Sequence, residues 1–180
     1  MIEKEYQSQI QKLNLNQLRK FWNKKHSGWE AGKVFEYSLI RAFELDGATV
    51  TYPYHVSNSA GIIEQIDGAI HLDNLNVLVE SKNYGSKTLN IEPIAKLQVR
   101  LLRRPASVIG CVFSSSGFTW PAQMLVETLE PKTILLWDKE DIEDCFKDGH
   151  FVSVLFEKYR YAIERGDHYY KPVSIKKIKI

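Results

Sequence analysis

The sequence predicts a mixed α/β domain, and three observations support this class. The 180 residues suit one ordinary domain, and 44% of them are hydrophobic, which is enough to bury one core. Segments 49–55, 62–72 and 75–82 are β-rich with a period of two, whereas helical spacing dominates elsewhere. Three consecutive strands followed by alternating helices and strands imply a mixed sheet with helices on both faces.

The first half of the chain supplies a polar arm, one core helix and the three strands. Segment 3–25 has loosely helical apolar spacing and is expected to pack on the core. A better-defined helix runs over 29–46, and Gly47 stands where its C-terminal cap belongs. Asp73-Asn74 is the turn signal between the second and third strands.

The second half alternates helices with strands. Asn90 and Pro93 open a helix that Pro105 ends. The remaining elements are a strand over 107–113, a helix over 120–129, a strand over 133–137 and helices over 138–146 and 151–164. We therefore expect an αβββαβ core with additional elements, divided into a helical N-terminal extension (1–28), a core (29–147) and a helical, basic C-terminal extension of the same domain (148–180). The lysines of 171–180 are a candidate surface for phosphate contact.

Composition excludes several classes of protein. The net charge is only +2, and no repeat or low-complexity tract is present. No apolar run approaches the length that crosses a bilayer, so we expect a cytoplasmic protein with no membrane partner. Cys111 and Cys145 are too few for a disulfide scaffold and lack zinc-type spacing, so both are expected to be reduced core thiols.

Two carboxylates and a lysine are expected to meet on neighbouring strands. Alternate residues of a strand share a face, so Glu80 and Lys82 project together with Leu78. The turn at 73–74 brings Asp67 beside Glu80. Glu64 has the opposite parity to Asp67, so we exclude it from the site.

Carboxylates without histidine or cysteine partners favour a hard cation such as Mg²⁺, with Mn²⁺ as a substitute. Such a metal activates water and neutralises phosphate charge, and the lysine stabilises a more negative transition state. This chemistry is phosphodiester hydrolysis. A strand-end aspartate beside an ordinary surface Glu/Lys pair explains the spacing equally well.

A third carboxylate lies within the apolar arc of helix 29–46. Glu36 falls between Phe43 and Ile40 on that arc, where an unpaired carboxylate would be costly. It either extends from the edge of the arc to solvent or reaches the metal site from the helix.

With these residues, the chain resembles the restriction-endonuclease-like superfamily with the PD-(D/E)XK motif, and most closely its Mrr-type catalytic domains. The segments that carry the resemblance are Gly32-Lys33-Val34-Phe35-Glu36, Gln65-Ile66-Asp67-Gly68, Glu80-Ser81-Lys82-Asn83-Tyr84, Gly110-Cys111-Val112-Phe113 and Ile134-Leu135-Leu136-Trp137-Asp138. The proline of the motif's name is absent before Asp67, where Ile66 stands.

The resemblance implies roles for individual residues. Asp67, Glu80 and the backbone carbonyl of Ser81 would bind the metal, and Lys82 would be the catalytic lysine. Glu36 matches the helix-borne acidic residue of the family, and Gln98 matches a polar residue that supports some family sites.

The helix after the triplet is basic along one side. Its charged residues are Lys96, Arg100, Arg103 and Arg104. They are candidate contacts to the DNA backbone, although such charges also occur on faces that only contact solvent.

We therefore expect a Mg²⁺-dependent deoxyribonuclease, an endonuclease of restriction or defence systems. The alternatives are a structure-selective junction or repair nuclease of the same fold, and a DNA-binding module without catalysis. One active site cuts one strand per event, so a homodimer is also expected, with a partner specificity subunit as the alternative.

Overall fold

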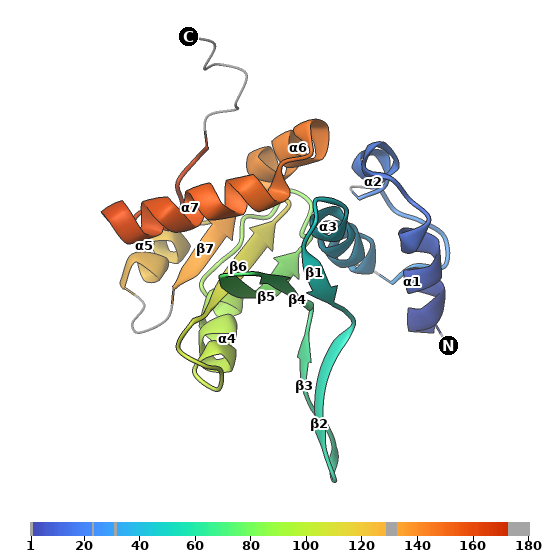
Figure 1. The fold of residues 1–180 in the computed structure, drawn as a ribbon, viewed down its shortest axis with the longest axis horizontal. Helices are drawn as coiled ribbons and strands as arrows, with labels where there is room; N and C mark the ends of the chain where they lie inside the picture. Colours follow the sequence, from blue (N-terminus) through green and yellow to red (C-terminus); the bar gives the residue numbers. More distant parts are fainter. Residues whose placement is uncertain (1, 23, 31, 129–132, 173–180) are drawn as a thin grey trace.

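The structure, a computed structural model, describes residues 2–22, 24–30, 32–128 and 133–172 (Figure 1). The helices are α1 (Ile2–Gln11), α2 (Leu15–Phe21), α3 (Lys33–Leu45), α4 (Glu92–Leu101), α5 (Trp120–Thr128), α6 (Lys139–Asp148) and α7 (Phe151–Arg165). The strands are β1 (Thr49–Thr51), β2 (Tyr54–Asn58), β3 (Gly61–Ile66), β4 (Gly68–Leu72), β5 (Leu75–Lys82), β6 (Val108–Ser114) and β7 (Ile134–Trp137).

A five-stranded mixed sheet forms the centre of the molecule. Its strand order is β1-β4-β5-β6-β7. The β1/β4 and β4/β5 pairs are antiparallel, whereas β5/β6 and β6/β7 are parallel. The predicted α/β class, with a mixed sheet between helices and an αβββαβ core, is confirmed.

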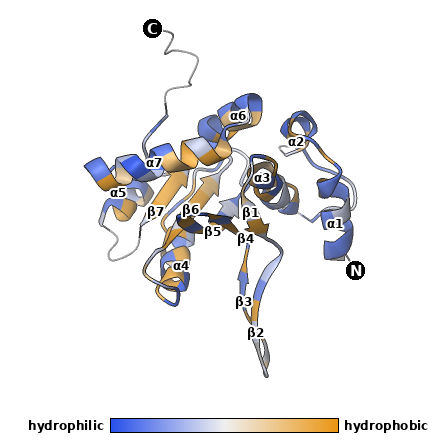
Figure 2. Cartoon of the chain, in the orientation of Figure 1, coloured by the Kyte–Doolittle hydropathy of each residue, from blue (hydrophilic) through white to orange (hydrophobic). Residues whose placement is uncertain are grey.

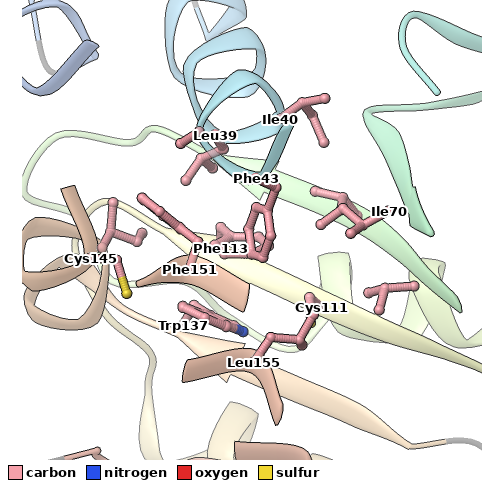
Figure 3. Close-up of a cluster of buried hydrophobic side chains, with 14 of the residues drawn as sticks. Leu39, Ile40, Phe43, Ile70, Cys111, Phe113, Trp137, Cys145, Phe151 and Leu155 are labelled. Atoms are coloured by element: carbon pink, nitrogen blue, oxygen red, sulfur yellow. The ribbon is translucent and has the colours of Figure 1, made fainter. Parts of the chain in front are cut away.

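Each face of the sheet packs against its own set of helices. Val77 and Val79 of β5 join a core with α3, α6 and α7, whereas Leu78 joins a second core with α4 and α5. In Figure 3, Phe43 of α3 lies over Phe113 and Trp137 of the sheet. Figure 2 shows the hydrophobic colouring along β6 and β7, which lie between these layers. Glu80 and Lys82 lie on the same face of β5 as Leu78, so their side chains point to the side of the sheet that α4 covers.

Two glycines allow the helices near the site to approach the sheet closely. A Cβ at Gly68, directly after Asp67, would lie 2.6 Å from Ile40 Cδ1 of α3. A Cβ at Gly110 of β6 would lie 2.7 Å from Leu97 Cδ2 of α4. Gly68 therefore sets the distance between α3 and the strand after Asp67, and Gly110 sets the distance between α4 and β6, the neighbour of β5.

The strand predictions need two corrections. The predicted strand 62–72 breaks at Asp67 into β3 and β4, and the predicted strand 49–55 breaks at 52–53 into β1 and β2. The middle pieces, β2 and β3, pair only with each other, with a bulge at Val56/Ser57. They form a hairpin that projects away from the central sheet (Figure 1).

Helix boundaries also differ from the sequence prediction. The helix predicted from residue 29 starts at Lys33, because Gly32 precedes it in the left-handed region with φ 88°. Its predicted end is confirmed by Gly47 at φ 98°. The N-cap of α4 is Ile91 rather than Asn90, whose side chain accepts a hydrogen bond from the Glu92 N–H at 3.3 Å.

The terminal segments pack onto the same core as α3. Tyr6 and Ile10 of α1, Leu18 of α2, and Trp22 are buried in the core cluster that contains Phe43. At the other end, most of the predicted basic tail, 173–180, lies outside the described residues. Within the described part of the chain, no helix has both the length and the apolarity to cross a bilayer.

Candidate active site

The β4–β5 hairpin brings Asp67 and Glu80 to the same end of the sheet. Gly68 pairs with Val79, so Asp67, one residue earlier, lies beside the strand position of Glu80. Ser81 fixes the aspartate, since its N–H and its hydroxyl donate to Asp67 Oδ2 at 2.6 and 2.9 Å. The two-residue turn predicted at 73–74 is present between Leu72 and Leu75 and sets this register.

Glu80 is almost completely buried, with 1% of its surface exposed, and two cations compensate its charge. Lys82 Nζ lies 2.6 Å from Glu80 Oε1, and Arg100 Nη1 donates to Glu80 Oε2. The lysine pairs with Oε1 electrostatically, but this oxygen has no aligned hydrogen-bond donor among the described residues.

The charges of this cluster shift one another's pKa values. Burial, and then the charge of Glu80, raise the pKa of Asp67 above its ordinary value, against the opposing effects of Lys82 and Ser81. Burial disfavours the charged form of Lys82, but Asp67 and Glu80 outweigh it and raise the pKa of the ammonium group. Lys82 is therefore a fixed positive charge at neutral pH.

The cluster faces an open cavity of about 600 Å³. Its lining comes from the Asp67, Glu80 and Lys82 cluster, from β3 and from the α4 segment. The residues that line it are Ile63, Glu64, Gln65, Asp67, Glu80, Lys82, Lys96, Val99, Arg100 and Arg103. The acidic and basic candidates from two separate stretches of sequence thus share one cavity.

Glu36 lies near the cluster but does not line the cavity. It is 8% exposed, and both of its oxygens accept hydrogen bonds from Lys33 Nζ, at 2.8 and 2.9 Å. Burial and then the charge of Asp67 raise the pKa of Glu36 to about 8, against the effect of Lys33. Lys33 was not predicted as a partner of Glu36, although its i,i+3 spacing to Glu36 is a signal for such a pair.

The exclusion of Glu64 is wrong. The chain bends at Asp67, so strand parity does not carry across from β3 to β4. Glu64 lines the same cavity, is 7% exposed, and pairs with Arg103 at 2.8 Å and Arg104 at 2.7 Å. This carboxylate links the hairpin to the C-terminal end of the α4 segment.

The predicted basic face of α4 is only partly exposed. Arg100 is 7% exposed and points inward to Glu80, so its predicted place on an exposed face is wrong. Lys96 is exposed and Arg103 has 56% of its side chain exposed, both at the cavity, whereas Arg104 is held by Glu64. Gln98 does not line the cavity, because it lies on another side of α4.

The oxygens of the cluster fit a hard cation. Glu80 Oε1 is a buried acceptor without an aligned donor, and both hydrogen bonds to Asp67 go to Oδ2. The Ser81 carbonyl accepts from Lys82 Nζ at 3.0 Å, so it lies beside the same ammonium group. No group of three or more His, Cys, Asp or Glu side chains arranged for a metal occurs among the described residues. Two carboxylates with completing waters match Mg²⁺ better than zinc.

Comparisons with known proteins gave similarities in solved structures only. A protein of unknown function, AF1548, is 15% identical with a TM-score of 0.46, over 72% of this chain and 69% of that one. The DNA modification-dependent restriction endonuclease AspBHI is 16% identical with a TM-score of 0.43, over 91% of this chain and 40% of that one. The MspJI restriction endonuclease, in complex with a 27-mer oligonucleotide, is 19% identical with a TM-score of 0.46, over 92% and 38%.

This chain therefore spans about two fifths of the length of the two endonucleases. No protein-family model and no curated protein matches the chain. Its function has to be inferred from the residues of its own site.

Proposed function

We propose that the chain is a divalent-metal-dependent endonuclease that hydrolyses DNA phosphodiester bonds. The observation that carries the proposal is the meeting of Asp67, Glu80 and Lys82 in one cavity whose opposite side is basic. Acidic groups suit a cation, and the basic groups of α4 suit the phosphates of the substrate.

Asp67 and Glu80 would hold the cation, Mg²⁺ or Mn²⁺, through carboxylate oxygens beside the cavity. When bound, such a cation supplies an activated water and neutralises charge on a phosphate. The contribution of Ser81 is to fix the Asp67 carboxylate through its two hydrogen bonds. Because both hydrogen bonds go to Oδ2, Asp67 would offer its other oxygen, Oδ1, to the cation.

Lys82 would act on the phosphate itself. Its ammonium group lies in the cavity between the carboxylates, with 24% of the side chain exposed. Because Asp67 and Glu80 keep it protonated, it provides positive charge where the transition state gains negative charge.

Lys96 and Arg103 would bind the DNA backbone next to the scissile phosphate. Both line the cavity, Lys96 is exposed, and 56% of the Arg103 side chain is exposed although its Nη2 pairs with Glu64 Oε1. Contacts of this kind give affinity that depends on salt and not on sequence.

A cleavage panel tests the proposal. Linear, branched, methylated and unmethylated DNA, with RNA as a further arm, is incubated with the protein in Mg²⁺ and in chelator. Mg²⁺-dependent cleavage of DNA supports the proposal, and strict preference for branched DNA changes it to a junction or repair nuclease. Equal DNA binding in Mg²⁺ and chelator, with no cleavage of any substrate, overturns it in favour of a binding module.

A place in restriction or defence, and a second subunit, are part of the same proposal. A single site cleaves one strand per event, so a homodimer would supply the second cut, and a partner specificity subunit would supply sequence recognition. Light scattering of the protein alone and with duplex DNA measures whether two copies assemble.

A further inference from the structure

Arg100 occupies a position that an ordinary DNA-binding arginine does not need. Its side chain is 8% exposed. Nη1 donates to Glu80 Oε2, Nη2 donates to the Gln65 carbonyl, and Nε lies 3.9 Å from Glu64 Oε1. One guanidinium therefore joins α4 to β5 and to the base of the β2–β3 hairpin.

The charges of the cluster balance without a metal. Asp67 and Glu80 contribute two negative charges, and Lys82 and Arg100 contribute two positive ones. A buried carboxylate with no cation nearby would be strongly destabilising. Arg100 thus neutralises Glu80, which is the function that a divalent cation would take over.

We propose that Arg100 is an internal counter-ion that competes with the divalent cation for Glu80, and that its release supplies a guanidinium to a phosphate of the DNA. The inference rests on the proposed metal-dependent function. In the metal-free protein Arg100 acts on the metal site through Glu80, and after its release it would contact the substrate directly. A cation that binds Glu80 repels the guanidinium, and the cavity that Arg100 lines is where a phosphate would enter. Guanidinium and phosphate form strong bidentate pairs.

The consequence is coupling between metal and DNA. In the free protein the cation must displace a bound guanidinium, so its affinity is reduced. When DNA is present, the phosphate binds the released guanidinium, so the affinity of the site for the cation is no longer reduced. By linkage, metal raises the affinity for DNA by the same factor that DNA raises the affinity for metal.

Titration calorimetry with Mn²⁺, without DNA, tests the competition directly. Arg100→Gln should bind Mn²⁺ at least about tenfold more tightly than the wild type, because even in a water-like dielectric a unit charge acts this strongly on a divalent ion a few ångströms away. Arg103→Gln is the matched control. It removes the same charge from the same cavity but from Glu64 rather than Glu80, and should change the Kd by less than about threefold, since an exposed charge is screened.

A second measurement uses the wild type alone, so it stands even if Arg100→Gln does not fold. Phenylglyoxal modifies accessible arginines, and mass spectrometry locates the product. Arg100 should be protected in the metal-free protein and become reactive with Mn²⁺, whereas the exposed Arg103 should react in both states. Protection of Arg100 that is unchanged by saturating Mn²⁺ would overturn the inference.

The outcomes separate the two proposals. Tighter Mn²⁺ binding by Arg100→Gln, and not by Arg103→Gln, supports the competition. Mn²⁺ binding that is detectable for Arg100→Gln but not for the wild type supports it as well. Binding by the wild type with equal or weaker binding by Arg100→Gln overturns it and leaves the metal-dependent function intact. No Mn²⁺ binding by any of these proteins overturns both.

Discussion

Two lysine–carboxylate clusters in this protein have similar composition and opposite accessibility. Lys82 lies with Asp67 and Glu80 at the cavity, and 24% of its side chain is exposed. Lys158 of α7 lies with Asp141 of α6, and their side chains are 1% and 4% exposed. Burial lowers the pKa of Lys158 despite the opposing effect of Asp141, whereas the carboxylates raise the pKa of Lys82 despite its burial.

The hydrogen bonds of the second cluster are complete. The three ammonium protons of Lys158 have three acceptors, namely Asp141 Oδ2 at 2.9 Å, the Leu136 carbonyl at 3.0 Å and the Tyr170 carbonyl at 2.6 Å. Asp138 beside it caps α6 and accepts from Tyr169 and Lys171. This cluster fastens β7, α6, α7 and the chain after α7 to one another.

The comparison shows that a buried charge alone does not indicate a functional site. The distinguishing feature is an open side, since Glu80 and Lys82 line the cavity and 24% of the Lys82 side chain is exposed. Lys158, with 1% of its side chain exposed, lacks such a side, so we interpret it as structural. Substitutions at the two lysines should therefore separate stability from activity.

The largest expected effect is on stability, at Lys158. Lys158→Met leaves the buried Asp141 with the partly exposed Lys171, 3.6 Å away, as its remaining cation, which should lower the free energy of unfolding by about 3 kcal/mol. Urea unfolding at pH 7 measures this loss. A loss under about 1 kcal/mol would mean that the Lys158 cluster is not the fastening that its geometry indicates.

Lys82→Met should mainly reduce activity rather than stability. Removing the ammonium group from the cavity should slow cleavage by on the order of 100-fold or more, since transition-state charge is no longer stabilised. Single-turnover cleavage and DNA binding are measured on the same samples. Wild-type cleavage by this variant would remove Lys82 from the proposed chemistry.

The next effect is a pH dependence caused by Glu36. Its pKa is about 8 in the fold and 4.5 as the ordinary value, so the unfolded chain releases this proton first. The stability that protonated Glu36 contributes is complete below pH 4.5 and is lost as pH rises through about 8. Glu36→Gln should therefore gain stability relative to the wild type between pH 5 and pH 8, measured by metal-free urea unfolding. Parallel pH profiles for the two proteins would show that Glu36 is ionised in the fold.

The smallest expected effect is on DNA affinity at Arg103. Arg103→Ala should weaken binding to all sequences alike and reduce the slope of log K against log salt by about 1, because one phosphate contact is lost. Arg165→Ala, which removes an exposed charge from α7, is the control. Equal slopes for both variants and the wild type would place the DNA away from α4.

The sequence predicted the parts of the site that depend on local pattern. The turn at 73–74 and strand parity were sufficient to place Asp67 beside Glu80 and to put Glu80 on the same face of its strand as Leu78 and Lys82. Both signals act over a few residues, and the β4/β5 register confirms them.

The parts that failed depend on contacts between distant segments. Glu64 enters the cavity because the chain bends at Asp67, which an apolar and β-rich segment does not reveal. Arg100 turns inward because Glu80 and the Gln65 carbonyl meet it there, 20 and 35 residues away in sequence. From the helical spacing alone, an arginine that turns inward cannot be distinguished from one that is exposed to solvent.

The most direct test of the central claim is the effect of Mg²⁺ on thermal unfolding and cleavage, measured together for the wild type, Asp67→Ala and Glu80→Ala. If the two carboxylates hold the cation, Mg²⁺ should raise the Tm of the wild type and permit cleavage of a DNA substrate that chelator prevents. Both responses should be absent in both variants. Mg²⁺-dependent cleavage at the wild-type rate by a folded Asp67→Ala protein would contradict the claim that this cluster is the active site.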